Sequence, residues 1–137
     1  MLLDVNLLLA LAWPNHQHHA VSVRWFAARE GEPWSTCALT ELAFVRLSSN
    51  PAFTAEAKDP VTAVSLLEAM TAHAHHRFLQ ELPRVTASDR WAHVGSAKAT
   101  TDAYLVMVAA HHGVQLATLD GRLARNPAFV ADTVLVV

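Results

Sequence analysis

Four carboxylates lie within or beside the most apolar segments of the chain, where charged residues are rare. They are four of the twelve acidic residues, Asp4, Glu41, Asp102 and Asp120, in the contexts LLDVNLLLALA, CALTELAFVRL, TTDAYLVMVAA and LATLDGRL. A lone charge beside an apolar core is costly, and two carboxylates about 4 Å apart repel by roughly 4 kcal/mol at an effective dielectric of about 20. A bound divalent cation would compensate for both effects. A set of four oxygen ligands, with no histidine in the same motifs and a single cysteine at the margin of one, favours Mg²⁺, with Mn²⁺ as a substitute, over zinc.

The segments around these acids alternate between short apolar runs and amphipathic helical patterns. Strands are predicted at 2–5, 34–37, 115–119 and 133–137, with a weak candidate at 77–82. Helices are predicted at 7–13, 16–29, 41–47, 60–72 and 102–112, the first capped by Asn6 and the third by Thr40. Strands that alternate with helices predict the α/β class with a parallel sheet covered on both faces.

The four acids are all expected at one edge of this sheet. Asp4 and Asp120 end strands, while Glu41 and Asp102 begin helices that follow strands or loops. Taken singly, a carboxylate at a helix N-terminus gains about 0.3 to 1 kcal/mol from the helix dipole, and an aspartate often starts a turn after a strand. Because ligands of open parallel sheets bind outside the carboxyl ends of the strands, the joint pattern favours a metal site.

Composition limits the class of protein. The 137 residues suit one domain, and 53% are hydrophobic while only 16% are charged, against about 25% charged in an average protein. A net charge of −2 argues against a strongly basic nucleic-acid-binding surface. A single cysteine, Cys37, excludes an intramolecular disulfide and suits the cytoplasm. No membrane association is expected, since no apolar run approaches the roughly 20 residues of a spanning helix.

The motifs, in their order and spacing, resemble PIN-domain ribonucleases and more narrowly the VapC-type toxins of bacterial type II toxin–antitoxin pairs. The matching pieces are LDVNLL at 3–8, LTEL at 39–42 with Arg46 and Asn50-Pro51 behind it, TDAYL at 101–105 and ATLD at 117–120. The resemblance implies a single PIN-like nuclease domain over residues 1–137, with a three-layer α/β/α fold around a mostly parallel sheet of four to five strands. It also implies that Asp4, Glu41, Asp102 and Asp120 are catalytic and bind Mg²⁺. Asn6 and Thr118, beside the motif acids, are expected to support the metal ligands.

The activity implied is Mg²⁺-dependent endonucleolytic hydrolysis of RNA, with transfer or ribosomal RNA as substrate. A toxin of this type inhibits translation and growth when free. It is held by a VapB-like antitoxin along a hydrophobic groove near the N-terminal helices, and it often forms a homodimer. The basic residues nearest the acid motifs are the expected contacts of the RNA phosphates, and they are Arg46, Lys98, Arg122 and Arg125. The stretch VGSAK at 94–98 departs from the more polar sequence of many relatives, which bears on substrate contacts.

Three other interpretations compete with a nuclease. A haloacid-dehalogenase-like phosphatase needs a second aspartate two residues after Asp4, where this chain has Asn6. A receiver domain needs paired acids after the first strand and a phosphoacceptor aspartate in mid-sequence. A catalytically silent PIN scaffold that binds partners is disfavoured because all four acids are present. The histidine clusters at 16–19 and 73–76 suit helix capping or RNA contact better than metal binding, since neither carries a HExxH arrangement.

Overall fold

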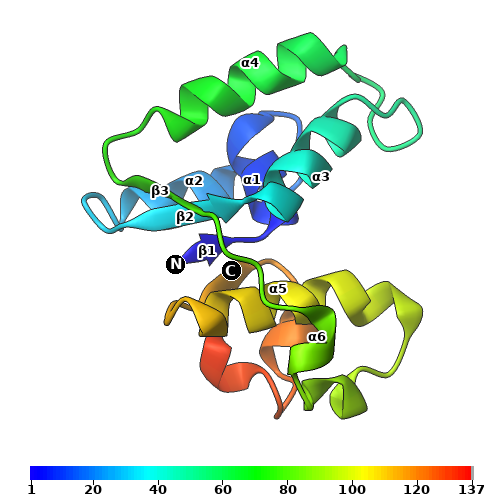
Figure 1. Ribbon diagram of the computed structural model, residues 1–137. Helices are drawn as coiled ribbons and strands as arrows, with labels where there is room; N and C mark the ends of the chain where they lie inside the picture. The colour runs from blue at the N-terminus through cyan, green and yellow to red at the C-terminus, as the bar shows by residue number, and fades with distance from the viewer. Residues whose placement is uncertain (137) are drawn as a thin grey trace.

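The computed structural model describes residues 1–136 and has five parallel strands between two layers of helices (Figure 1). The strands are β1 (Leu2–Leu3), β2 (Trp34–Cys37), β3 (His76–Leu79), β4 (Leu116–Thr118) and β5 (Thr133–Leu135). The helices are α1 (Val5–Ala12), α2 (His19–Ala27), α3 (Ala38–Ser48), α4 (Pro60–Thr71), α5 (Thr100–His111) and α6 (Gly121–Ala124). The predicted three-layer α/β/α fold is confirmed.

The sheet has the order β3-β2-β1-β4-β5, so the first strand of the chain is the central one. Leu2 of β1 pairs with Ser35 of β2 on one side and with Leu116 of β4 on the other. All pairings are parallel, so the residues that follow β1, β2 and β4 emerge at the same edge of the sheet. Asp4, Glu41 and Asp120 follow these three strands.

Each face of the sheet carries its own core, because successive strand residues point to opposite faces. Leu3 packs with Leu8, Phe44 and other side chains of α1, α3 and α4, while Leu2 packs with the buried side of α5 and with α6. Figure 1 shows the same division, with α1 to α4 on one face of the sheet and α5 and α6 on the other. Helix α5 is apolar around most of its circumference, and its residues 103, 105–109 are all buried.

Helix starts differ from the predictions in four of the five predicted helices, and α5 begins at Thr100, two residues before its predicted start. Asp4, not Asn6, is the residue that precedes α1, because the helix begins directly after the strand. Helix α3 begins at Ala38, so the predicted cap Thr40 lies inside its first turn, where its hydroxyl accepts a hydrogen bond of 3.0 Å from the Cys37 amide. The hydroxyl thus satisfies a free backbone amide from within the helix. Helix α2 begins at residue 19, since residues 16–18 form a turn instead of helix.

Most other boundaries fall close to those predicted. The Asp59 side chain accepts a hydrogen bond from the Thr62 amide at the start of α4, and Gly113 takes the positive φ of 66° expected after α5. The weak strand candidate at 77–82 is a real strand, β3, which begins one residue earlier and ends three residues earlier than predicted. The last predicted strand is confirmed at Thr133–Leu135, and its final residue, Val137, lies outside the described residues. Over residues 1–136, no helix has the length and apolar character needed to cross a membrane.

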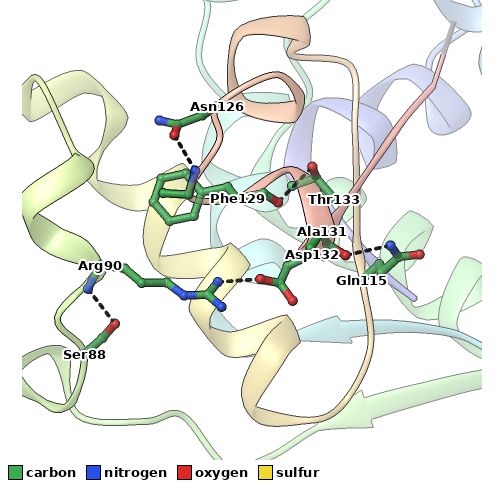
Figure 2. Close-up of polar contacts among 9 residues, drawn as sticks. Ser88, Arg90, Gln115, Asn126, Phe129, Ala131, Asp132 and Thr133 are labelled. Carbon is green, nitrogen blue, oxygen red and sulfur yellow. Dashed lines mark hydrogen bonds and ion pairs between the residues drawn. The ribbon is translucent and has the colours of Figure 1, made fainter.

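A long segment between β3 and α5 wraps the α5 side of the molecule in short 3-10 turns, Val85–Ala87, Arg90–His93 and Ala97–Ala99. Arg90 forms an ion pair with Asp132, which precedes β5, as Figure 2 shows. The amide of Arg90 also donates to the Ser88 hydroxyl at 3.1 Å. Gln115, before β4, donates to the carbonyl of Ala131 at 3.0 Å. The Arg90–Asp132 ion pair fastens the segment beside β5, and the Gln115–Ala131 bond ties the residues before β4 and β5 together (Figure 2).

Candidate active site

Asp4 lies between β1 and α1, and only 1% of its surface is exposed. Its Oδ2 accepts a hydrogen bond of 2.9 Å from the Thr118 hydroxyl, across 114 residues of sequence. The same hydroxyl accepts a bond of 3.0 Å from the Asp120 amide, so Thr118 ties the end of β4 to the end of β1. The other oxygen, Oδ1, is buried and has no hydrogen-bond partner among the described residues. An ionised carboxylate with a bare buried oxygen is unstable without a compensating positive charge.

Burial and the neighbouring acids raise the pKa values of Asp4 and Asp102. Burial, and after it the charge of Asp102, raises the pKa of Asp4 to about 6, while the hydrogen bond from Thr118 opposes the rise. Burial also raises the pKa of Asp102, with a second contribution from the charge of Asp120 and an opposing one from Arg122. The three aspartates therefore form one interacting group, in which each added negative charge disfavours the next.

Asp120 is the aspartate of this group whose ionised form is stabilised. It precedes α6, and its Oδ1 accepts a hydrogen bond of 2.8 Å from the Arg122 amide. Burial acts to raise the pKa of Asp120, but the hydrogen bonds and the charge of Arg122 outweigh it and leave the pKa below its usual value. The Arg122 guanidinium lies 3.4 Å from Oδ2 and its side chain is 91% exposed. It can therefore reach solvent or a ligand while it stays beside the carboxylate.

A cavity of about 270 Å³ opens beside Asp102 and Asp120. Its wall includes Lys98 and Arg122, two of the four cations predicted to contact phosphate. It is also lined by His93 and Asn126, which sequence reasoning missed because neither belongs to a motif and both arrive from outside the acid segments. The Arg90–Asp132 ion pair fastens the 3-10 segment that carries His93.

The other two predicted cations lie elsewhere. Arg46 is exposed in the last turn of α3 and does not line the cavity. Arg125 follows α6, and its guanidinium lies over Gly121, so that a Cβ at Gly121 would be 2.8 Å from Nη1. Asn6, a predicted supporting residue, is exposed in the first turn of α1. Thr118 is the supporting residue that the structure places against a motif acid.

Glu41 follows β2 at the same sheet edge, but its carboxylate is engaged with β2 itself. Its Oε1 accepts a hydrogen bond of 2.6 Å from the hydroxyl of Thr36, which also lies 2.8 Å from Nε2 of His76. Within residues 1–136, no three histidine, cysteine or acidic side chains stand close enough together to hold one metal ion as they are placed. The convergence of all four acids on one ion therefore stays a prediction.

The donor set nevertheless fits a hard divalent cation. The buried, partnerless Oδ1 of Asp4 is an oxygen that a cation would satisfy, and the coupled charges of Asp102 and Asp120 would be relieved by the same ion. All of these ligands are carboxylate oxygens, as Mg²⁺ and Mn²⁺ prefer. Glu41 would join them through Oε2, the oxygen that does not bond to Thr36.

Comparison with known proteins identifies the family of the chain. The PIN domain family model matches residues 1–128. The chain belongs to the PIN-domain family. Ribonuclease VapC39 of Mycobacterium tuberculosis is 42% identical over 126 residues, which cover 90% of this chain and 90% of the relative. Ribonuclease VapC38 of the same organism is 43% identical over 119 residues, which cover 87% of this chain and 84% of the relative. Ribonuclease VapC44, also of that organism, is 33% identical over 129 residues, which cover 90% of this chain and 87% of the relative. The resemblance to VapC-type PIN domains, predicted from four short motifs, is confirmed.

Proposed function

We propose that this PIN-domain chain is a Mg²⁺-dependent endoribonuclease that acts as the toxin of a toxin–antitoxin pair. The observation that carries the proposal is Asp4, a buried carboxylate with one bare oxygen whose charge is coupled to that of Asp102. Asp102 and Asp120 in turn line a cavity whose wall includes Lys98 and Arg122. The relatives named as VapC ribonucleases support the same activity.

The residues of the proposed site have different roles. Asp4, Asp102, Glu41 and Asp120 would hold the ion, and Thr118 fixes one oxygen of Asp4 so that the other points to it. A bound Mg²⁺ supplies a water of lowered pKa and neutralises charge on the phosphoryl oxygens.

Cationic side chains in the cavity wall would position the substrate. Lys98 and Arg122 would hold the phosphates next to the scissile bond, and Arg122 would exchange part of its contact with Asp120 for phosphate. Arg125 would add a contact farther along the RNA, as would Arg46 from α3. Phosphate contacts of this kind set the register of the substrate without selecting its sequence.

RNA cleavage by the purified protein tests the proposal. Asp4→Asn should abolish Mg²⁺-dependent cleavage of RNA while the protein stays folded, whereas Glu56→Gln, at an exposed acid away from the site, should cleave like wild type. End-mapping of cellular RNA after induction of both variants would show whether transfer or ribosomal RNA is cut, and whether translation and growth stop only with wild type. Full cleavage by Asp4→Asn would refute the site.

An antitoxin of the VapB kind is the proposed partner. An apolar groove of about 530 Å³ lies between α2 and α4, near the N-terminal helices, and is lined by Leu11, Val23, Phe26, Ala27, Trp34, Ala69, Met70, Ala72 and His73. Its apolar lining suits the hydrophobic face of a short peptide segment. Val23→Glu should abolish complex formation with the cognate antitoxin during co-expression without reducing RNA cleavage by the free protein.

A homodimer in the cytoplasm completes the proposal. Leu42 on α3 and Val61 and Val64 on α4 are large apolar side chains with exposed fractions of 66%, 75% and 49%, and the two helices pack against each other. An exposed apolar patch of this kind typically marks a protein interface. Light scattering of the purified chain should give the mass of a dimer, and Val61→Lys should give the mass of one chain.

A further inference from the structure

Thr36 of β2 connects two titratable side chains from different elements. It is completely buried, and its hydroxyl donates to Oε1 of Glu41 at 2.6 Å. The same oxygen lies 2.8 Å from Nε2 of His76, the first residue of β3 and forty positions away in sequence. Glu41, Thr36 and His76 thus form one hydrogen-bonded chain that runs from the helix α3 terminus to the edge strand of the sheet.

The direction of each bond follows from proton counting. A threonine hydroxyl has one proton, and in this chain it is given to the carboxylate, which when ionised can only accept. His76 must therefore donate its Nε2 proton to the Thr36 oxygen. Burial lowers the pKa of His76, opposed by the charge of Glu41 and by a hydrogen bond to the Thr71 backbone, so the neutral ring is favoured. Donation to the Thr36 oxygen would then place the ring proton on Nε2.

Two contacts fix His76 in this orientation. Its ring packs on Trp34 with ring centroids 4.6 Å apart, and the two residues are register partners in the parallel pairing of β2 and β3. Because Trp34 is 5% exposed and held by the core of α1, α3 and α4, the imidazole has a rigid support. The support lies outside the four acid motifs.

We propose that His76 and Thr36 are positioning residues for Glu41, which together hold its carboxylate at the sheet edge with Oε2 left free for a divalent cation. The inference rests on the proposed function. A glutamate side chain loses rotamer freedom when it is fixed, and a hydrogen-bonded chain in the metal-free protein would supply part of that ordering in advance. Hydrogen-bond partners of metal-binding side chains typically change metal affinity by about 10 to 100 fold.

Manganese binding, measured by electron paramagnetic resonance of the free ion, tests the proposal without relying on catalysis. Thr36→Val, which keeps the shape of the side chain and removes the hydroxyl, should weaken Mn²⁺ binding about tenfold or more, while Thr36→Ser should bind within about threefold of wild type. His76→Phe, which keeps a ring against Trp34, should also weaken binding, and His76→Gln, which keeps an N–H donor, should restore part of it. His75→Phe is the control at the neighbouring histidine and should bind Mn²⁺ like wild type.

The outcomes separate this inference from the nuclease proposal. Unchanged Mn²⁺ affinity in Thr36→Val and His76→Phe, together with weakened affinity in Asp4→Asn and Glu41→Gln, would overturn the positioning role and keep the metal site. Unchanged affinity in Asp4→Asn would overturn the metal site itself. Thermal unfolding with a chelator checks that each variant is folded.

A second measurement applies to the unmodified protein. Nitrogen chemical shifts of the imidazole report which ring nitrogen is protonated, and His76 should be the neutral tautomer with the proton on Nε2. The proton should move freely between both nitrogens in Thr36→Val. A wild-type His76 protonated on Nδ1 alone would overturn the proposed direction of the chain.

Discussion

Replacement of Asp4 by asparagine should change how stability depends on pH. A buried carboxyl whose pKa is raised from 3.8 to about 6 holds its proton in the folded state at pH values where the unfolded chain has lost it. Between these two values the folded protein binds more protons than the unfolded chain, so the free energy of unfolding falls as pH rises from 3.8 to about 6 and stays low above it. Asp4→Asn removes this loss because asparagine does not titrate.

The magnitude follows from the two pKa values. The full difference corresponds to roughly 3 kcal/mol at about 1.36 kcal/mol per pH unit. When the pH is lowered from about 7.5 to about 5, proton linkage should raise the free energy of unfolding of wild type by about 1.4 kcal/mol relative to that of Asp4→Asn. For a protein of this size the gain equals a relative rise in Tm of about 4 to 6 °C. The constant cost of an unpaired amide in the variant cancels in this comparison between pH values.

Urea denaturation of wild type and Asp4→Asn at the two pH values, in a chelating buffer, measures this difference. At the lower pH, the free energy of unfolding of wild type should rise relative to that of Asp4→Asn. Glu56→Gln should keep a constant difference from wild type at both pH values. Added Mg²⁺ at the higher pH should stabilise wild type and leave Asp4→Asn unchanged, because a ligand stabilises only the state that binds it. A gap that is equal at both pH values would refute the buried, charge-coupled state of Asp4.

Three further changes test the surroundings of the site. Thr118→Val should cost about 1 to 3 kcal/mol by chemical denaturation, since it leaves a buried carboxylate oxygen unpaired, and Thr118→Ser should recover most of that loss. Asp132→Asn should reduce the free energy of unfolding by only about 1 kcal/mol or less, because both side chains of the Arg90–Asp132 ion pair are partly exposed. The same change should loosen the cavity wall and therefore raise KM for RNA more than it lowers kcat. Equal changes in KM and kcat would contradict a positional effect. Gly121→Ala should displace the Arg125 guanidinium, whose Nη1 would lie 2.8 Å from the new Cβ, and should weaken RNA binding about as much as Arg125→Ala does, which a filter-binding titration can check.

The hydrophobic pattern of the sequence was sufficient to predict the strands of the sheet and the strand or helix end at which each acid lies. The apolar run before Asp4 and the β-branched runs near residues 116 and 133 predicted strands, and the parallel order then placed the strand ends at one edge. Helix starts were less predictable, because an aspartate that ends a strand can precede the next helix without an intervening residue. Asn6 was therefore mistaken for the residue that begins α1.

The directions of the side chains required contacts between distant segments. The partner of Glu41 is a hydroxyl on β2, and the histidine behind it belongs to a strand that a weak apolar pattern barely indicated. His93 lines the cavity because an ion pair between Arg90 and Asp132 fastens a segment without helical or strand periodicity, and Asn126 reaches the same wall from the turn after α6. Motif spacing carries no information on any of these packing arrangements.

The central position of the first strand has a consequence for synthesis of the protein. Asp4 reaches its hydrogen-bond partner only when residue 118 has been made, and β1 is flanked on one side by β4, which comes late in the chain. Chains grow from the N-terminus, so a nascent polypeptide has the acids of its first half but not the strand that assembles them. The aspartates of the two halves of the chain can therefore come together only late in synthesis.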